Sequence, residues 1–593
     1  MMEQFMYEKL KDVYGYTSFK QGQQDIVKSI LQKKDSLGIM PTGGGKSLCY
    51  QLPALLMEGT TFVISPLISL MKDQVDTLNS MGVSSTYINS SVSVKEMNNR
   101  MMNISMNKYK LVYIAPERLD SEPFIERLHN IQIPLIAIDE AHCISQWGHD
   151  FRPSYMNIYS FIRKLPQRPV VAAFTATATD KVEADIVRNL NLKNPHITKT
   201  GYARNNLSFS ILKGANKQDF LQTYLQNRTE ESGVIYASTR KEVDQCYETL
   251  KKMGFSVDKY HAGLSEKERK SNQDRFLFDD VKIIVATNAF GMGIDKSNVR
   301  FVIHLNLPKN IESYYQEAGR AGRDGEPGEC ILIFSPQDII TQKYLIEQSE
   351  KDDTYKAKAY SQLQQMIDYC HTSSCLQQYI VRYFGDQTYD ICHKCSNCID
   401  DRELTDITNE ALKVISNVKR MKERFGVTLT AKVLKGSSDS KVLQFGFNKL
   451  STYGLMKEKK EKEVIQLIQL LIADGFLELT ESKYPTVRLN NKSIQVLKGE
   501  EKVFQKVQVI AKEEKTVPYD EALFTELRKL RKEIADEENL PPFTIFHDAS
   551  LVEMCTKRPT NEISFLAIKG VGQAKYQKYG ERFIELISDF SAS

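Results

Sequence analysis

Residues 40–47, MPTGGGKS, have the composition of a phosphate-binding loop between an apolar segment and a helical one. Three consecutive glycines let the backbone turn tightly and point its N–H groups at phosphate oxygens, and the following helix N-terminus adds the positive end of its dipole. Lys46 would reach the β and γ phosphates of a nucleoside triphosphate, and the Ser47 hydroxyl would ligate Mg²⁺. Met40 replaces the first glycine of the strict motif, so a literal pattern search would miss the loop. The predicted nucleotide-binding residues of this loop are Thr42, Gly43, Gly44, Gly45, Lys46 and Ser47.

Two adjacent carboxylates end the apolar run LIAID at residues 135–139. A strand that ends in Asp139 and Glu140 places both at the carboxyl edge of a sheet, where open α/β folds bind ligands. Asp139 would hold Mg²⁺, partly through water, and Glu140 would orient or deprotonate the attacking water. Alone, the acidic pair could be a helix cap, and the glycine-rich loop could be a turn with a surface lysine. Their occurrence about 95 residues apart favours a nucleoside triphosphatase.

Four of the ten cysteines lie within 24 residues, with sixteen, two and two residues between them. Four thiolates at such spacing suit a closed tetrahedral Zn²⁺ site. An iron–sulfur cluster is the alternative, but Ile399 and Asp400 follow where the ferredoxin pattern needs C-x-x-x-C-P. The other cysteines are interpreted as small apolar residues. The predicted metal ligands are Cys375, Cys392, Cys395 and Cys398.

Short apolar runs rich in β-branched residues alternate with longer helical stretches from about residue 25 to 340. This alternation predicts mostly parallel sheets with helices on both faces. The strands are too numerous for one sheet, and the polar segment 194–210 is a candidate hinge between two halves. Examples of these predicted strands are TFVIS (61–65), LVYIA (111–115), LIAID (135–139), VVAAFT (170–175), GVIYA (233–237), KIIVAT (282–287) and FVIHL (301–305).

The last 250 residues or so have a different organisation. Helices lead into the cysteine cluster, and residues 405–500 combine helices with two short strands around ESKYP (481–485), as in a winged helix. A charged stretch near 500–518 is typical of a linker, and the final 75 residues predict a small helical domain. The run KEKKEK (457–462) alternates lysines with acids, which favours a solvated helix face over a binding patch.

The overall composition is that of an ordinary folded protein. With 593 residues, 41% hydrophobic and 26% charged, the chain predicts three to five domains and contains no apolar window long enough for a membrane span. The N-terminus lacks an apolar signal segment, which predicts an intracellular protein. A net charge of +4 neither supports nor excludes a nucleic-acid partner.

Nine motifs, in a fixed order along the chain, resemble those of RecQ-type DNA helicases of superfamily 2. The resemblance runs from about residue 8 to the end and makes a chance match negligible. The matching segments are FKQGQ (19–23), MPTGGGKSLCYQ (40–51), SPLISLMKDQ (65–74), IAPERL (114–119), DEAHCISQWGHDFRP (139–153), TATA (175–178), YHAGL (260–264), ATNAFGMGIDK (286–296) and SYYQEAGRAGRDG (313–325).

The resemblance implies a multidomain α/β architecture of the bacterial type. Two RecA-like parallel-sheet lobes would be followed by a helical zinc-binding subdomain, a winged helix and a small all-helical HRDC domain. It also selects zinc over an iron–sulfur cluster. The implied boundaries are 1–205 and 206–340 for the lobes, 341–402 for the zinc subdomain, 403–505 for the winged helix and 519–593 for the HRDC domain.

Several further site residues follow from the matching motifs. Tyr16, Lys20 and Gln23 match the motif that recognises adenine, although the family more often has Arg at the position of Lys20, and Lys lacks its planar fork. In the second lobe, the resemblance implies that Gly293 and Asp295 sense nucleotide. Gln316, Arg320 and Arg323 would reach across the cleft toward the γ-phosphate. The implied catalytic set is Lys46, Asp139, Glu140, Gln316, Arg320 and Arg323.

The chain has one tryptophan, seven residues after Glu140. The segment around it resembles the family's aromatic-rich loop, which links DNA to the nucleotide site. An aromatic ring stacks on a single-stranded base irrespective of sequence. The alternative is a tryptophan packed in the domain core, which the polar neighbours Ser145 and Gln146 disfavour. The implied DNA-coupling residues are Trp147, His149, Phe151 and Arg152.

The C-terminal segments also have counterparts in the family. Residues 424–442 are similar to the early part of its winged helix, and residues 525–580 resemble an HRDC domain. Gly570–Gly572, with Lys569, Lys575 and Lys578 nearby, could present N–H groups to a phosphate. Alternatively, these glycines only close a tight connection between helices.

The resemblance implies an enzyme that uses ATP, Mg²⁺ and Zn²⁺ to move 3′ to 5′ along single-stranded DNA and unwind duplexes, forks or recombination intermediates. Its implied setting is DNA repair, recombination and the SOS response in the cytoplasm, associated with the nucleoid. Implied partners are single-stranded and duplex DNA, single-strand-binding protein and a topoisomerase or nuclease, with the enzyme a monomer. The competing functions are an RNA helicase and a DNA-binding scaffold with an inactive motor.

Overall fold

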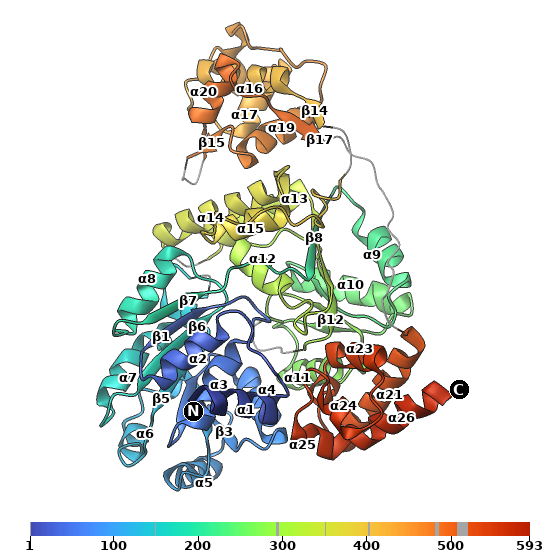
Figure 1. Ribbon diagram of the computed structural model, residues 1–593. Helices are drawn as coiled ribbons and strands as arrows, with labels where there is room; N and C mark the ends of the chain where they lie inside the picture. The colour runs from blue at the N-terminus through green and yellow to red at the C-terminus, as the bar shows by residue number, and fades with distance from the viewer. Residues whose placement is uncertain are drawn as a thin grey trace.

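The computed structural model of the chain describes residues 2–148, 150–291, 296–349, 352–400, 404–480, 485–506 and 520–592. Its first sheet has seven parallel strands in the order β3-β4-β2-β5-β6-β1-β7. Helices pack around this sheet (Figure 1). The strands are β1 Ser36–Ile39, β2 Thr61–Ile64, β3 Ser85–Ile88, β4 Leu111–Ile114, β5 Leu135–Ile138, β6 Val170–Thr175 and β7 His196–Lys199.

The helices of this first lobe alternate with its strands. The α-helices are α1 Met2–Tyr14, α2 Gln23–Leu31, α3 Lys46–Leu56, α4 Ile68–Ser80, α5 Val94–Ser105, α6 Glu122–Arg127, α7 Ile158–Lys164 and α8 Asp180–Asn189. The 3₁₀ turns are η1 Pro116–Arg118, η2 Ala141–Ile144 and η3 Pro153–Asn157. Every residue of β1, β2, β4, β5 and β6 is buried, as expected for parallel strands covered on both faces.

The strand register of the first sheet brings its functional segments to one edge. Ile39 of β1 pairs with Thr175 of β6, and Ile138 of β5 pairs with Ala173 of β6. The glycine-rich loop after β1 and the carboxylates after β5 therefore leave the same carboxyl edge, where α/β sheets bind ligands.

A second sheet has six parallel strands in the order β10-β11-β9-β12-β13-β8. Its strands are β8 Leu207–Lys213, β9 Ser232–Tyr236, β10 Val257–Tyr260, β11 Ile283–Ala286, β12 Val299–His304 and β13 Gly328–Phe334. Its helices are α9 Lys217–Gln226, α10 Arg240–Lys252, α11 Glu266–Leu277 and α12 Ile311–Ala318. The prediction of mostly parallel sheets is thus confirmed.

The chain passes between the two sheets inside the segment 194–210, but that segment is not all hinge. It contains β7, which pairs with β1 at the edge of the first sheet, and the start of β8. Residues 196–199 are mostly exposed and polar, so their sequence lacks the apolar pattern of a strand. The connecting residues proper lie between Lys199 and Leu207.

Three helices cover the β8 side of the second lobe and lead to the cysteine cluster (Figure 1). They are α13 Pro336–Glu347, α14 Asp353–His371 and α15 Leu376–Tyr383. The backbone N–H of Ser396, in the cysteine loop, donates to the Phe209 carbonyl of β8 at 2.9 Å. The cysteine loop is therefore fastened to the second sheet.

Residues 404–506 form the domain at one end of the molecule (Figure 1). Asp474 fixes it to the segment between α14 and α15, since Ser373 Oγ donates to Asp474 Oδ2 at 2.6 Å. Residues 481–484 of the predicted turn lie outside the described residues. Residues 457–460 of the lysine run form the turn before α19, and its last two residues, Glu461 and Lys462, begin that helix. The elements are β14 Leu404–Asp406, α16 Thr408–Arg420, α17 Val427–Lys435, α18 Ser440–Gln444, η4 Phe447–Lys449, α19 Glu461–Ala473, β15 Glu478–Leu479, β16 Val487–Arg488, α20 Asn491–Lys498 and β17 Phe504–Lys506. Both strand pairs, β14 with β17 and β15 with β16, are antiparallel.

The C-terminal helices form a small domain that lies against both lobes (Figure 1). Its elements are α21 Glu521–Glu538, α22 Pro542–Ile545, α23 Asp548–Lys557, α24 Glu562–Leu566, α25 Gln573–Lys575, η5 Tyr576–Gly580 and α26 Glu581–Ala592. The Gly570 N–H donates to the Gly15 carbonyl of the first lobe at 3.2 Å. A Cβ on Gly15 would lie 2.4 Å from the Val571 carbonyl carbon, so the two backbones touch.

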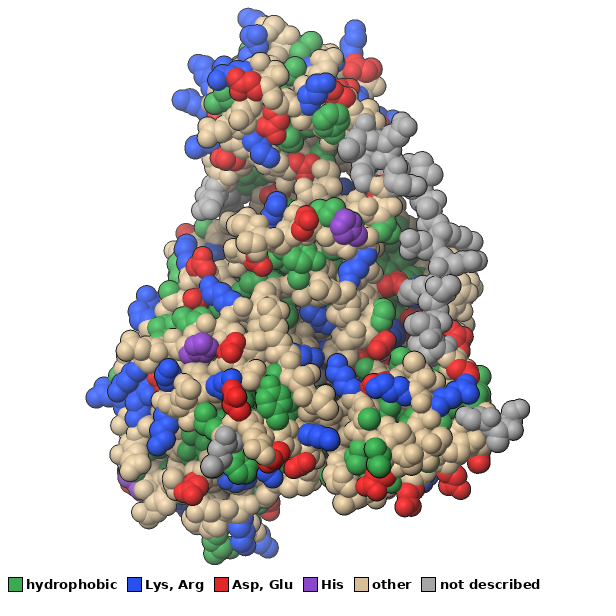
Figure 2. All heavy atoms as spheres, viewed as in Figure 1, with side chains coloured by type: hydrophobic (Ala, Val, Ile, Leu, Met, Phe, Trp, Pro, Cys, Tyr) green, Lys and Arg blue, Asp and Glu red, His purple; other side chains and the backbone are tan. Residues whose placement is uncertain are grey.

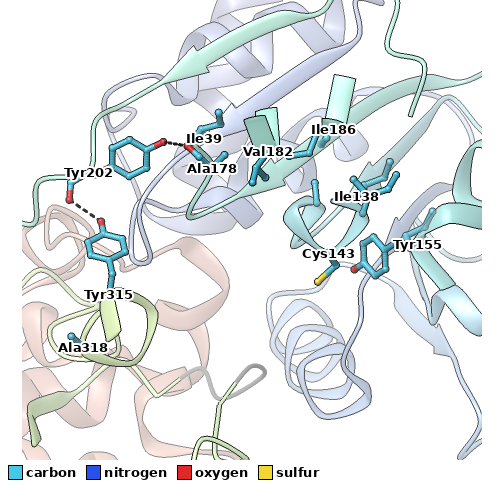
Figure 3. Close-up of a cluster of buried hydrophobic side chains, with 14 of the residues drawn as sticks. Ile39, Ile138, Cys143, Tyr155, Ala178, Val182, Ile186, Tyr202, Tyr315 and Ala318 are labelled. Atoms are coloured by element: carbon cyan, nitrogen blue, oxygen red, sulfur yellow. Dashed lines mark hydrogen bonds between the residues drawn. The ribbon is translucent and has the colours of Figure 1, made fainter. Parts of the chain in front are cut away.

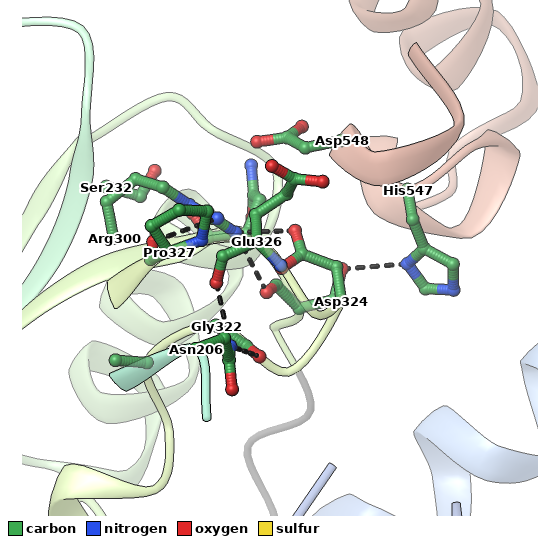
Figure 4. A network of polar contacts seen from close by, with 12 residues as sticks. Asn206, Ser232, Arg300, Gly322, Asp324, Glu326, Pro327, His547 and Asp548 are labelled. Carbon is green, nitrogen blue, oxygen red and sulfur yellow. Dashed lines mark hydrogen bonds and ion pairs between the residues drawn. The ribbon is translucent and has the colours of Figure 1, made fainter. Parts of the chain in front are cut away.

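This contact gives the 570–572 loop a role that neither sequence interpretation contained. Its first N–H binds the first lobe, and Lys575 Nζ donates inward to the Thr544 carbonyl at 2.7 Å. On the other side, Figure 4 shows His547 and Asp548 facing residues of the second lobe, where His547 Nδ1 lies 2.8 Å from Ser297 Oγ. The C-terminal domain therefore bridges the lobes.

No helix in the described part of the chain is both long and apolar enough to cross a bilayer. Basic and acidic side chains are interspersed over the lobes on the face shown in Figure 2, which fits the net charge of +4.

Candidate active site

The glycine-rich loop turns sharply between β1 and α3. Gly43 and Gly45 have φ angles of 80° and 78°, a left-handed conformation that favours glycine. A Cβ on Gly45 would lie 2.4 Å from Gln23 Nε2, so glycine is required there for space as well. Lys46 is the first residue of α3, which places it at the positive end of the helix dipole.

Two of the residues predicted to recognise adenine hold this loop from outside. Gln23 Nε2 donates to the carbonyls of Gly44 and Gly45 at 3.2 and 3.1 Å. Lys20 Nζ donates to the Gly43 carbonyl at 2.8 Å, and its backbone N–H donates to Gln23 Oε1 at 2.8 Å. Tyr16 packs in the small apolar cluster beside the loop, where burial raises its pKa. Lys20 and Gln23 therefore bind the phosphate loop directly, while Tyr16 packs against the cluster that contains Leu48 and Leu52 of α3.

The two carboxylates after β5 lie opposite Lys46. The Asp139 N–H donates to the Ile64 carbonyl at 2.9 Å, and Glu140 has a φ of 48°, an uncommon conformation for a non-glycine residue. Burial and the adjacent Glu140 raise the pKa of Asp139 to about 7. Burial lowers the pKa of Lys46, against the influence of both carboxylates. The carboxyl edge of the sheet thus brings together Lys46, Asp139 and Glu140, and the shifted pKa values of Lys46 and Asp139 indicate that their charges are only partly stabilised by the protein.

His142 connects Glu140 to the next motif and was not assigned a role from the sequence. Its buried Nδ1 lies 3.3 Å from Glu140 Oε2 and 2.9 Å from Thr175 Oγ1. Thr175 Oγ1 donates to the Thr177 carbonyl at 3.1 Å. Gln316 Nε2 of the second lobe donates to Thr177 Oγ1 at 3.4 Å. A chain of polar contacts therefore runs from Glu140 across the cleft to Gln316, and its middle members Thr175 and Thr177 belong to the TATA motif.

The arginine-bearing segment of the second lobe lies directly against the phosphate loop. A Cβ on Gly43 would be 3.4 Å from the Cα of Arg323, and one on Gly319 would be 3.4 Å from Thr42 Cβ. Arg320 is 6% exposed, and its Nε and one Nη have no hydrogen-bond partner among the described residues. Gly293 and Asp295 lie outside the described residues.

Trp147 is 45% exposed, so it is not a core residue. Two cations approach its ring, with Lys181 Nζ at 4.8 Å and Lys358 Nζ at 5.2 Å from the ring centroid. Lys358, on α14, also donates to the Gln146 carbonyl at 3.0 Å. The loop thus contacts both α8 and α14, and it presents an aromatic face next to positive charge, a combination typical of surfaces that bind single-stranded nucleic acid.

The other residues predicted for DNA coupling are placed differently. Arg152 donates from Nε to Asp150 Oδ2 at 2.9 Å and from Nη1 to the Pro66 carbonyl at 2.8 Å, so in this structure its guanidinium braces the loop. Phe151 is partly buried, and His149 lies outside the described residues.

A cavity of about 1070 Å³ joins the aromatic loop to the second lobe. Trp147 and Phe151 line it together with Gln316 and Arg320, and Lys358 lines it from the zinc subdomain. Residues predicted for DNA and for nucleotide therefore face one space.

The four clustered cysteines converge as the spacing predicts, with their Sγ atoms all within 4.8 Å of one another. Backbone N–H groups donate to the sulfurs, for example from Cys392 to Cys375 Sγ and from Leu376 to Cys395 Sγ, both at 3.3 Å. Tetrahedral bonds of about 2.3 Å would place sulfurs roughly 3.8 Å apart, close to this arrangement. Such N–H···S bonds orient and stabilise thiolate ligands.

Family models match successive parts of the chain. They are the DEAD/DEAH box helicase at residues 20–185, the helicase conserved C-terminal domain at 216–325, the RecQ zinc-binding domain at 336–399, the RQC domain at 401–514 and the HRDC domain at 520–587. The ATP-dependent DNA helicase RecQ of Bacillus subtilis is 49% identical over 583 residues, covering 98% of each chain. RecQ of Pasteurella multocida is 39% identical over 99% of this chain and 94% of that one. The chain belongs to the RecQ family of ATP-dependent DNA helicases.

This RecQ chain has a zinc-binding region, because the RecQ zinc-binding match spans the cysteine cluster. The iron–sulfur alternative is thereby rejected. The two helicase matches, at residues 20–185 and 216–325, fall on the two lobes. The resemblance found in the sequence is confirmed over nearly the whole chain.

Proposed function

We propose that this RecQ helicase hydrolyses ATP in the cleft between the lobes in order to move 3′ to 5′ along single-stranded DNA and to unwind duplexes, forks and recombination intermediates. The observation that carries the proposal is the shared cavity, in which Trp147 faces the same space as Gln316 and Arg320. DNA bound at the tryptophan would lie next to groups that act on ATP.

In the proposed mechanism, the loop N–H groups and Lys46 bind the β and γ phosphates. Ser47 and Asp139 would hold Mg²⁺, which would neutralise charge on the phosphates. The raised pKa of Asp139 supports this assignment, because a nearby cation would stabilise its charged form. Glu140 would orient and deprotonate the attacking water. Arg320 and Arg323 would then stabilise the negative charge that develops on the γ-phosphate.

DNA would control hydrolysis through the aromatic loop. A base stacked on Trp147 would compete with Lys181 and Lys358 for the ring, while its phosphates would attract both lysines. The loop starts one turn after Glu140 and His142, so its movement would alter how Glu140 is held. Closure of the cleft on ATP and its opening after hydrolysis would then produce the steps.

The remaining proposals concern domains and setting. We propose the boundaries 1–205, 206–340, 341–402, 403–505 and 519–593 for the lobes, zinc subdomain, winged helix and HRDC domain, with a role in DNA repair near the nucleoid. Single-strand-binding protein and a topoisomerase or nuclease are the proposed partners, and the enzyme is proposed to act as a monomer.

The decisive experiment measures phosphate release from ATP without nucleic acid, with single-stranded DNA, and with RNA of the same sequence. Strong stimulation by DNA alone is expected. Equal stimulation by RNA would favour an RNA helicase, and no hydrolysis would favour a scaffold. Duplexes with a single 3′ or 5′ tail then test direction, since only the 3′-tailed substrate should be unwound.

A further inference from the structure

The segment between the two sheets contacts both lobes through polar groups. Tyr202 Oη donates to the Ala178 carbonyl of the first lobe at 2.7 Å, and its own carbonyl accepts from Tyr315 Oη of the second lobe at 2.8 Å. Figure 3 shows these two bonds in series between the lobes. The connection is therefore a packed and hydrogen-bonded part of the cleft wall, and its geometry bears on how the lobes meet.

Arg204, two residues further on, contacts two motifs at once. Its guanidinium donates to the Thr42 carbonyl in the phosphate loop. It also donates to the Gly319 and Ala321 carbonyls at 3.2 and 3.1 Å, and to the Gly322 carbonyl at 2.9 Å. Gly319 to Gly322 form the turn that carries Arg320 and leads to Arg323. One side chain thus joins the phosphate loop to the arginine-bearing turn.

The chemistry of this contact is specific to arginine. A guanidinium offers five N–H donors in a rigid plane, whereas a lysine ammonium is a single flexible point. Arg204 is 7% exposed, and these four acceptors are neutral carbonyls rather than carboxylates. Burial lowers its pKa, with nearby Arg323 acting in the same direction. A buried cation held by carbonyls is costly, and its position beside a site for phosphates explains why it is tolerated.

We propose that Arg204 is a positioning residue for ATP hydrolysis, which holds the Arg320–Arg323 turn against the phosphate loop so that Arg323 can act on the γ-phosphate. Arg204 acts through Arg323 and does not itself bind the nucleotide. The proposal rests on the proposed ATPase function and adds to it a connecting residue that couples the lobes.

Asn206 provides a matched comparison. Its Nδ2 donates to the Gly322 and Glu326 carbonyls, both at 2.7 Å, so it supports the same turn from within the second lobe. It makes no contact with the phosphate loop among its hydrogen bonds to described residues. Substitution of a residue that only stabilises the turn should affect stability and kcat as substitution of Asn206 does. Substitution of a residue that joins the lobes should lower kcat much further.

The test measures DNA-stimulated phosphate release by the full chain at varied ATP. Arg204→Gln should lower kcat on the order of a hundred-fold, the effect of losing one charge-stabilising group, and should change KM for ATP less than about three-fold. Arg204→Lys should recover part of kcat. Asn206→Ala should lower the melting temperature without a comparable fall in kcat.

A double-mutant cycle separates positioning from general structural support. If Arg204 acts through Arg323, the Arg204→Gln/Arg323→Ala variant should be no slower than Arg323→Ala alone. Multiplied losses, or a rise in KM with normal kcat, would overturn the proposal. Should Arg204→Gln fail to fold, the same cycle with Arg204→Lys gives the answer. An inactive wild-type chain would refute the proposed function itself, while an active wild type with a fully active Arg204→Gln refutes only this inference.

Discussion

The cysteine cluster and the nucleotide cleft both bring reactive side chains together. The side chains of the cluster have partners within the protein, whereas the charges of the cleft are only partly stabilised by it. In the cluster, four sulfurs face one another and accept backbone N–H groups, so the ligands complete a closed site. In the cleft, two nitrogens of Arg320 have no partner among the described residues, and the charge of Asp139 is disfavoured by burial and by Glu140.

This difference separates stability from catalysis. Charged and polar side chains that are paired with one another inside the protein stabilise the fold. Those that lack a full set of partners are available to bind a ligand. The comparison therefore predicts that substitutions in the cluster lower thermal stability but leave the chemistry of ATP hydrolysis unchanged. Substitutions in the cleft should slow hydrolysis and leave stability unchanged. Thermal stability and the turnover of ATP must therefore be measured together for each variant.

The largest effect is expected from loss of the metal site. Cys395→Ala should abolish zinc binding and lower the melting temperature markedly, because metal-binding free energy is also folding free energy at such sites. Cys370→Ala is the matched control, since Cys370 is buried nearby on α14 but is not part of the cluster. Zinc content and thermal unfolding measure the outcome. Unchanged melting with lost hydrolysis would mean that the cluster takes part in chemistry.

The second largest effect is expected in the cleft, on turnover instead of stability. Glu140→Gln should reduce kcat by about 10² to 10⁴ because it removes the proposed general base while retaining the shape of the side chain. ATP binding and the melting temperature should stay close to wild type. The exposed Glu122, paired with Lys164, gives the control Glu122→Gln. A large loss of stability in Glu140→Gln alone would show that Glu140 is mainly structural.

The interface of the HRDC domain sharpens the comparison, because its charges are buried but paired. Arg531 Nη1 lies 2.8 Å from Asp548 Oδ1, and Figure 4 shows Asp548 near Arg300 and Asp324. Burial opposes the charge of Asp548, but Arg531 and the arginines around it hold its pKa below the usual range. By our criterion this network is structural.

Its pH dependence follows from the direction of that shift. A carboxylate with a depressed pKa in the folded state stabilises above its unfolded pKa of about 3.9, and this contribution is lost as pH falls through the folded pKa. Asp548→Asn should destabilise the domain by roughly 1 to 3 kcal/mol at pH 7, because Arg531 keeps a buried charge. Hydrogen exchange in α21 and α23 measures the change, with Glu585→Gln on α26 as control. Equal protection in both variants at pH 7 would contradict this.

The sequence predicted the parts of the fold and site that depend on local patterns. Apolar runs such as residues 170–175 are fully buried strands, and the cysteine spacing led directly to the cluster. It did not predict β7. The four residues of this strand, HITK, are mostly polar and exposed, and only their pairing with β1 identifies them as a strand. A polar strand at the edge of a sheet lacks the apolar run by which buried strands are predicted.

Contacts between distant segments were also beyond the sequence. Arg204 has no motif around it, and its importance appears only when the carbonyls of Thr42 and Gly319 lie beside it. Likewise, the Gly570 loop looked like a phosphate site or a simple turn, and only its bond to Gly15 shows that it docks on the first lobe. Tertiary partners, rather than residue types, decide these roles.

The smallest effect is expected at the open end of the cleft. Trp147→Ala should leave ATP binding and basal hydrolysis intact but reduce stimulation by single-stranded DNA roughly ten-fold, within the 1 to 3 kcal/mol of one base–aromatic stack. Trp147→Phe keeps an aromatic face and should retain most of the stimulation. Because the ring is half exposed, stability should change little in either variant. Full stimulation of Trp147→Ala by DNA would separate the aromatic loop from catalysis, and the shared cavity would then no longer explain how DNA controls hydrolysis.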